Sequence, residues 1–198
     1  MSRRIIPFAT ALALAAAVSC AKQEAAPPSP VRFVREHVRV EPSEGRTRVV
    51  GTYSFRNNSD TACDVGMRYP FPVDRGHLYP LRIRVDEERD RGPEPMGFVR
   101  EEAGIAWRMR FAPRQEKAVR VEYVQEILEK RAIYIVTTTR QWMRPIDIAE
   151  FEFRVPAALE GVRLSFEPDR TEVVGDTVVH RMTRAQFMPE SDLTVTWR

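Results

Sequence analysis

The stretch of residues 140–145 carries the side chains best suited to bind a ligand. It places the indole of Trp142 between the guanidinium groups of Arg140 and Arg144, and it breaks the alternation of the residues before it. An indole face can stack on a sugar ring, and a guanidinium can contact a phosphate. In a loop, these three residues form a candidate binding site for glycans or lipid head groups. The structural alternative is that Trp142 closes the open end of a folded body, with Arg140 or Arg144 packed over it.

Residues that commonly serve catalysis or metal binding do not form recognisable patterns. The three histidines are His37, His77 and His180, and none lies in an HExxH motif or near a second ligand at metal spacing. There is no glycine-rich phosphate loop and no G-x-S-x-G motif. The adjacent Glu101 and Glu102 would point to opposite faces of a strand, so they do not share an acid–base site. We therefore expect a non-enzymatic chain with no catalytic residue, no metal and no cofactor.

Cys20 is the other residue with a specific expected chemistry. Arg3 and Arg4 precede an apolar run over residues 5–18, and small residues lead into Cys20. A basic start, a short apolar run and small residues before a cut site are typical of an export signal. The run is interrupted by Pro7. It is also shorter than the ~20 apolar residues that a membrane span needs.

Residues 17–20 resemble the bacterial lipobox, the cleavage motif of lipoprotein signal peptides, with Ala17 at the position that is usually Leu. The resemblance implies that the Cys20 thiol carries a diacylglyceryl group and that residues 1–19 are removed as a signal peptide. Two or more acyl chains anchor a domain stably. Because Ala21 rather than Asp follows the cysteine, the resemblance implies an exported cell-envelope lipoprotein in the outer membrane, facing the periplasm. The alternative is an ordinary secretory signal with an incidental cysteine.

The two alternatives predict different states for Cys63, the only other cysteine of the sequence. If Cys20 is lipidated, Cys63 is alone, and we expect a small buried apolar side chain. If Cys20 is not lipidated, a disulfide between the two becomes possible in an oxidising compartment.

The charge of the chain gives no reason to expect a nucleic-acid partner. Arg3 and Arg4 are the only charged residues of the first 19, so the remainder holds 29 of the 31 basic groups and all 28 acidic groups. Nucleic-acid binding depends on an excess of basic side chains at the phosphates. The expected partners are instead a membrane, through the lipid anchor, and a protein of the envelope.

The chain divides into a linker and a folded body. Residues 20–30 carry the expected lipid and a spacer that three prolines keep extended: Pro27, Pro28 and Pro30. Residues 31–198 form the body, with a possible seam near 127–131 between two stacked β units. Helical spacing over residues 124–131 favours one short helix or a bent strand there.

Strict alternation of apolar and charged residues predicts half-buried strands in the body. The pattern is clearest over residues 107–111, 119–123, 151–155 and 193–197. Turn signals separate further strands, which we expect at 31–41, 47–56, 63–69, 79–86, 131–138, 161–166 and 177–182. Many strands at this spacing predict an all-β antiparallel β-sandwich with at most one or two short helices.

Two prolines follow one of these strands in the sequence Tyr69-Pro70-Phe71-Pro72. Since proline cannot donate a ladder hydrogen bond, this stretch lies at a sheet edge or leaves the sheet. It either protects that edge against aggregation or presents Tyr69 and Phe71 to a partner.

Three segments of the body resemble secreted bacterial β-sandwich proteins of unknown function. They are Tyr53-x-Phe55-x-Asn57 followed by the proline motif at 69–72, then Tyr134-x-x-Thr137-Thr138-x-x-x-Trp142-x-x-Pro145-Ile146, and Phe187-x-Pro189-x-x-Asp192-Leu193-x-Val195-x-Trp197. The resemblance spans most of residues 31–198 and implies a fold but no activity.

Two functions are compatible with this sequence. The first is a membrane-tethered envelope lipoprotein that acts as a non-enzymatic protein-interaction or structural module. The alternative is a binding module for envelope glycans or lipid head groups that uses Arg140, Trp142 and Arg144.

Overall fold

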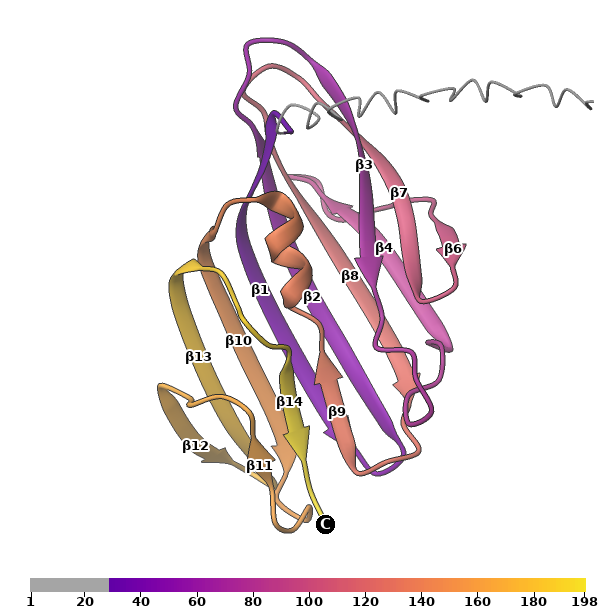
Figure 1. Cartoon of the computed structure of the whole chain (residues 1–198), viewed down its shortest axis with the longest axis vertical. Coiled ribbons are helices and arrows are strands. Elements are labelled where there is room, and N and C mark those ends of the chain that lie inside the picture. The colour runs from indigo at the N-terminus through magenta and orange to yellow at the C-terminus, as the bar shows by residue number, and fades with distance from the viewer. Residues whose placement is uncertain (1–28) are drawn as a thin grey trace, which may run out of the picture.

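The computed structural model describes residues 29–198 as an all-β body with one short 3₁₀ helix (Figure 1). An eight-stranded sheet has the order β12-β13-β10-β1-β2-β8-β4-β5, and two three-stranded sheets have the orders β11-β14-β9 and β3-β7-β6. The strands are β1 (Val31–Ser43), β2 (Arg46–Asn57), β3 (Cys63–Pro70), β4 (Arg82–Glu88), β5 (Glu94–Pro95), β6 (Val99–Glu101), β7 (Gly104–Phe111), β8 (Glu116–Glu126), β9 (Arg131–Tyr134), β10 (Ile146–Pro156), β11 (Arg163–Leu164), β12 (Arg170–Val174), β13 (Thr177–Phe187) and β14 (Leu193–Thr196); the helix is η1 (Thr137–Trp142).

The long central strands alternate as the sequence predicts. Along β8, for example, Val119, Val121 and Tyr123 are buried while the residues between them are half-buried. The opposite face of the large sheet carries ion pairs between neighbouring strands, such as Arg48 to Glu122 at 2.7 Å. One face of the sheet therefore forms the core and the other faces solvent.

The two small sheets cover the apolar face of the large one, which makes the body a sandwich. Buried residues of β3 and β7, such as Met67 and Trp107, belong to the same core cluster as Val38 of β1. Val195 of β14 and Tyr134 of β9 belong to it as well. In Figure 1, β3 and β7 cross in front of the right half of the large sheet, and β9, β14 and η1 lie in front of its left half.

The predicted fold class is confirmed, with two differences in detail. Every predicted strand range overlaps an observed strand. The predicted helix or bent strand at 124–131 is not a helix: β8 continues to Glu126, and residues 128–130 form the turn into β9. The helix lies instead at 137–142, within the stretch expected to be strand and loop. The second difference is that β1 pairs with β10 in parallel, although their other partners are antiparallel.

Because of this parallel pairing, the sequence on both sides of residues 127–131 contributes to one sheet. β1, β2, β4 and β8 precede that range, whereas β10, β12 and β13 follow it. The two parts meet where β1 pairs with β10. In this pair Arg35 lies opposite Ile148 at one end and Val40 lies opposite Phe153 at the other.

Tyr69 and Phe71 are buried, so the alternative that they present themselves to a partner is wrong. Their exposed fractions are 9% and 2%, and both rings pack against Tyr123 of β8. The two prolines do end β3, which is the edge strand of its small sheet. The sharp exit after Pro70 turns the Phe71 ring into the core.

The predictions for Cys20, the signal peptide and most of the linker lie outside the described residues. Cys63 is described: it opens β3, is half-buried, and packs against the core. Within residues 29–198, no helix has the length and apolar character that a membrane crossing requires.

Candidate functional site

A β-bulge near the start of β1 turns an acidic side chain into the core. Val31 and Phe33 face inward, but the register of β1 against β2 shifts between Phe33 and Arg35. After this shift the inward positions become Glu36, Val38 and every second residue beyond. A bulge adds one residue to a strand and thereby re-aims the side chains that follow it. Glu36 is consequently only 3% exposed.

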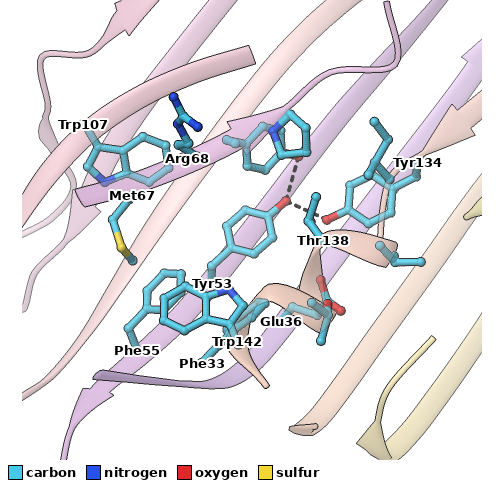
Figure 2. Close-up of a pocket in the computed structure, with 15 residues that line it drawn as sticks. Phe33, Glu36, Tyr53, Phe55, Met67, Arg68, Trp107, Tyr134, Thr138 and Trp142 are labelled. Carbon is cyan, nitrogen blue, oxygen red and sulfur yellow. Dashed lines mark hydrogen bonds between the residues drawn. The ribbon is translucent and has the colours of Figure 1, made fainter. Parts of the chain in front are cut away.

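A chain of three tyrosine hydroxyls lies beside Glu36. Tyr53 sits directly opposite Glu36 in the β1–β2 pair. Its hydroxyl is 2.9 Å from that of Tyr69 and 3.0 Å from that of Tyr134 (Figure 2). The tyrosines come from β2, β3 and β9, so this chain of hydroxyls joins all three sheets.

Tyr53 reaches this position because β2 has a glycine two residues earlier. A Cβ atom on Gly51 would lie 1.9 Å from the hydroxyl oxygen of Tyr53 and 2.3 Å from its Cζ. The ring therefore lies across the backbone of its own strand in the space that any other residue would fill. This close approach explains a glycine in the middle of a buried strand.

Around these groups lies a cavity of about 60 Å³ between the large sheet and η1. Seven of the fifteen residues that line it are aromatic, and Figure 2 shows Tyr53 near the centre, with Phe55 and Trp142 on one side and Tyr134 on the other. The residues that line it are Phe33, Glu36, Tyr53, Phe55, Met67, Arg68, Tyr69, Pro70, Trp107, Tyr134, Ile135, Val136, Thr138, Thr139 and Trp142. We call this space the Glu36 pocket. Of its lining, Arg68 is exposed, and Pro70, Ile135, Thr138 and Trp142 are half-buried, so these residues form the side of the pocket nearest to solvent.

Burial dominates the electrostatics of the pocket. It raises the pKa of the Glu36 carboxyl from 4.5 to about 8, and hydrogen bonding with Tyr134 offsets only part of the shift. Burial also raises the pKa of Tyr53, Tyr69 and Tyr134 well above the ordinary value for a phenol. A carboxyl in an apolar site avoids the cost of a desolvated charge by holding its proton. Near pH 7 the pocket is therefore lined by one protonated acid and three neutral phenols.

Glu36 and Trp107 have polar atoms that the rest of the described chain does not satisfy. Glu36 Oε1 and Trp107 Nε1 are buried and have no hydrogen-bond partner among residues 29–198. Both residues line the pocket. A buried polar atom without a partner costs about 1–3 kcal/mol, so most folded proteins contain few of them. Such atoms are therefore candidates for contact with a ligand.

One carboxylate holds η1, the helix on one side of the pocket, in place. Oδ1 of Asp192 accepts hydrogen bonds from the backbone N–H groups of Val136 and Thr137, both at 3.0 Å, and from the Thr137 hydroxyl at 2.8 Å. Amide groups at the start of a helix lack partners within the helix. Asp192 supplies the missing acceptor from the segment before β14.

At the other end of η1, Trp142 packs onto the large sheet. Its ring centroid lies 5.4 Å from that of Phe55 and 6.0 Å from that of Phe33. Met143 then ends the helix with a left-handed backbone, φ 58°, and its N–H donates to the carbonyl of Arg140. The indole is half-buried and lies at the pocket opening.

The three residues predicted to bind a ligand together do not surround one site. Trp142 lines the Glu36 pocket, but Arg140 and Arg144 do not. Arg140 is exposed, and its Nε donates to the carbonyl of Pro189 at 2.9 Å. Arg144 lines a separate, smaller depression of about 10 Å³ with Trp142 and Val31. A ligand contact by these three residues stays a prediction, with Trp142 best placed for it.

Sequence reasoning missed Glu36 and the tyrosine chain. The signal for Glu36 is a change of phase in the alternation: Val31 and Phe33 occupy odd positions, whereas Val38 and Val40 occupy even ones. Two adjacent apolar residues, Phe33 and Val34, mark where the phase changes. Glu36 shares the phase of Val38, which indicates an inward carboxyl. The meeting of tyrosines from three strands has no comparable signal, because it depends on how the sheets stack.

No group of three metal-ligand side chains occurs among the described residues. His77, the one buried histidine there, has a structural environment: Nδ1 lies 2.7 Å from Asp74, and Nε2 donates to the carbonyl of Arg131 at 2.9 Å. The pocket lining includes one carboxyl and no histidine, cysteine or lysine. These side chains suit the binding of a small group better than the holding of a metal.

Comparisons with known proteins support the fold. No protein-family model matches the chain, and no curated protein matches it. Among solved structures, a candidate nutrient binding protein from Legionella pneumophila has a TM-score of 0.66 at 14% identity, covering 86% of this chain and 67% of that protein. An M1 zinc metallopeptidase from Deinococcus radiodurans has a TM-score of 0.51 at 12% identity, covering 84% of this chain and 42% of the peptidase.

These likenesses concern the architecture alone, because the identities are 14% and below. The chain spans less than half the length of the peptidase, so its fold is shared with a part of that enzyme. Neither likeness assigns a ligand or a reaction to the Glu36 pocket.

Proposed function

We propose that this chain is an exported, membrane-tethered lipoprotein whose β-sandwich binds a small ligand without transforming it. The sequence supports export and tethering through the signal-like start, Cys20 and the spacer of residues 20–30. The pocket supports ligand binding over a purely structural role. Of the two functions that the sequence allows, we therefore favour the binding module.

The observation that carries the proposal is the Glu36 carboxyl. It is 3% exposed, it borders a cavity that opens to solvent, and its Oε1 has no partner among the described residues. Perturbed, unsatisfied carboxyls concentrate at functional sites, because a group that only stabilised the fold would be paired or apolar. Burial also keeps the neighbouring phenols neutral, which makes them weak bases and weak nucleophiles.

Ligand binding can be tested with the full-length chain in detergent, using peptidoglycan fragments and amine-bearing phospholipid head groups as probes. Two of the three tryptophans, Trp107 and Trp142, line the pocket, and Trp197 does not. We expect a saturable change in tryptophan fluorescence that persists in Trp197→Phe. Equilibrium dialysis should show loss of bound probe in Trp142→Ala, so that a lost fluorophore is not mistaken for lost binding.

Two results would contradict ligand binding at this site. The first is the absence of saturable binding by any probe. The second is binding that Trp142→Ala leaves unchanged, which would place the probe elsewhere on the molecule.

A second candidate function, contact with an envelope protein, is favoured by an apolar patch. Leu78, Leu81 and Leu128 are 39%, 59% and 67% exposed. Backbone hydrogen bonds from Leu78, Leu81 and Leu128 to β8 or to Gly76 hold them at one end of the body. Exposed apolar patches often mark protein contacts, and these leucines lie on segments that the backbone hydrogen bonds bring together. A photo-crosslinker at Leu81 should capture a reproducible partner, and the same crosslinker at Val173, 71% exposed on β12, should not.

A further inference from the structure

We infer that the Glu36 pocket binds a small organic ammonium group, such as a quaternary amine or a primary alkylammonium. This inference rests on the proposed binding function and names the chemistry of its ligand. It depends on three features of the pocket: the Glu36 carboxyl, the aromatic rings in its walls and its size.

The Glu36 carboxyl determines the sign of the ligand, because the other unsatisfied atom of the pocket, Trp107 Nε1, is a neutral donor. Glu36 is 3% exposed, and its Oε1 lacks a partner in the described part of the chain. Once ionised, the carboxylate would pair with a cation at close range in a site with little water. An anionic group would meet repulsion from an ionised Glu36 and a loss of its own hydration beside a neutral one. The only guanidinium in the lining, Arg68, is exposed at the opening and pairs with Glu101 at 3.0 Å.

The aromatic residues in the pocket walls also favour a positively charged ligand. Aromatic faces attract cations through their negative quadrupole, and desolvated sites strengthen this attraction to about 2 kcal/mol or more. Phe33, Tyr53, Phe55, Tyr134 and Trp142 all line the pocket. A carboxylate together with aromatic rings is the combination that recognises substituted ammonium ions.

Size limits the part of the ligand that enters. The cavity of about 60 Å³ is well below the ~150 Å³ that holds a benzene ring. A sugar ring, an aromatic ring or a whole trimethylammonium group, which is about as large as benzene, therefore enters only in part or with displacement of the walls, whereas a primary ammonium group fits. The opening between Arg68 and Trp142 lets the remainder of a larger ligand extend outward. Both a free amine and an ammonium-bearing lipid head group meet this requirement.

Binding of a cation should release a proton, because it needs the carboxylate. The groups that face Glu36 are Tyr53 of β2, Tyr69 of β3 and Tyr134 of β9, while β10 places Ala149 beside it. Burial keeps these phenols neutral over the range in which Glu36 titrates, with a pKa near 8. Affinity for a cation should therefore rise about tenfold per pH unit up to pH 8 and level off above it.

The test compares choline with 3,3-dimethyl-1-butanol, a neutral molecule of the same shape, by equilibrium dialysis against the full-length chain in detergent. We expect choline to bind at least ~10-fold tighter than the alcohol at pH 8, since only choline gains the cation–π and ionic contacts. Choline affinity should fall as the pH decreases to 6. Glu36→Gln should bind choline at least ~10-fold more weakly and without pH dependence. Glu102→Gln, which removes an exposed carboxylate in the β6–β7 turn, should match the unchanged chain.

A second pair of probes distinguishes the two sources of ammonium. Tighter binding of glycerophosphocholine than of choline would indicate a lipid head group. Equal or weaker binding would indicate a free amine.

Several outcomes would overturn the inference. If choline and its neutral isostere bind equally, or if Glu36→Gln retains the affinity and pH profile, the ammonium assignment is wrong. If the neutral alcohol binds and Trp142→Ala abolishes that binding, the pocket remains a ligand site with a different ligand class. If neither compound binds and the glycan and head-group probes also fail, both the inference and the proposed binding function are wrong.

Discussion

At the scale of single residues, Glu36 makes the stability of this protein depend on pH in an unusual direction. Carboxylates in salt bridges have lowered pKa values and stabilise a fold as the pH rises. For Glu36, burial raises the pKa from 4.5 to about 8, so the folded state binds the proton more tightly than the unfolded state does. Tighter proton binding by Glu36 therefore stabilises the folded state in full below pH 4.5, and this stabilisation is lost as the pH rises towards 8.

Glu36→Gln should remove this dependence. The free energy of unfolding of the unchanged chain should fall relative to the variant by up to about 1.4 kcal/mol per pH unit between pH 5 and 8. Urea unfolding at several pH values measures the difference, and other titrating groups cancel in the comparison. A constant difference across this range would mean that Glu36 is not held protonated by burial.

Gly51 is the second residue at which a substitution should have an effect that is specific to this fold. Gly51→Ala places a methyl group 1.9 Å from the Tyr53 hydroxyl oxygen, so the ring must move and the hydroxyl chain to Tyr69 and Tyr134 must break. We expect a loss of about 1–3 kcal/mol in the free energy of unfolding, as for other overpacked cores. Thermal or urea unfolding measures it.

Gly66 in β3 provides a matched control, because nothing lies within 4 Å of a Cβ built there. Gly66→Ala should leave stability unchanged or raise it by a few tenths of a kcal/mol, through the smaller entropy of the unfolded chain. Equal effects of the two alanines would show that the Tyr53 ring does not depend on the space beside Gly51.

At the scale of elements, η1 depends on a distant segment for its position. A 3₁₀ helix of this length has little stability of its own. Asp192 accepts three hydrogen bonds at the start of the helix, and the Trp142 ring packs on β1 and β2 at its end. Loss of either contact should open one side of the Glu36 pocket.

Asp192→Ala should therefore release η1 while the sandwich stays folded. We expect a loss of about 1–2 kcal/mol, comparable to removal of a helix cap, and a red shift of tryptophan emission as Trp142 becomes exposed. Glu190→Ala, at an exposed position two residues earlier, controls for changes in the same segment. Unchanged emission in Asp192→Ala would mean that packing of Trp142 alone fixes the helix.

At the scale of the whole molecule, the pocket lies close to the point where the described chain begins. β1 begins at Val31, directly after the proline-containing spacer. Trp142 and Arg144 line a depression together with Ser29 and Val31, so η1 ends beside the point where the chain enters the body. If Cys20 is anchored as proposed, this end of the sandwich and the pocket opening lie near the membrane surface.

The tether itself can be tested by the intact mass of the chain extracted from membranes of its own host. We expect a chain that begins at Cys20, carries added acyl mass and has one alkylatable thiol, that of Cys63. A lighter chain whose two thiols become alkylatable only after reduction would mean a Cys20–Cys63 disulfide and no lipid anchor. The half-buried position of Cys63 in β3 requires mild unfolding before alkylation in either case.

The sequence determined the fold class, because period-two alternation between charged and apolar residues produces a two-faced sheet wherever it occurs. The strands around Val119–Tyr123 and residues 151–155 needed no tertiary information. The expected export signal and lipid anchor are also inferred from local patterns, and they stay predictions. Trp142, which lines the pocket, also stands out locally, because its indole interrupts an alternating run; its contact with a ligand stays a prediction.

Only the tertiary structure decided which side chains meet. A bulge of one residue turned Glu36 inward, and the parallel pairing of β1 with β10 joined two distant parts of the chain into one sheet. The stacking of three sheets then brought Tyr53, Tyr69 and Tyr134 within hydrogen-bonding distance, and it left Arg140 outside the pocket. Such contacts depend on register and on the packing of sheets, to which residues far apart in the sequence contribute together.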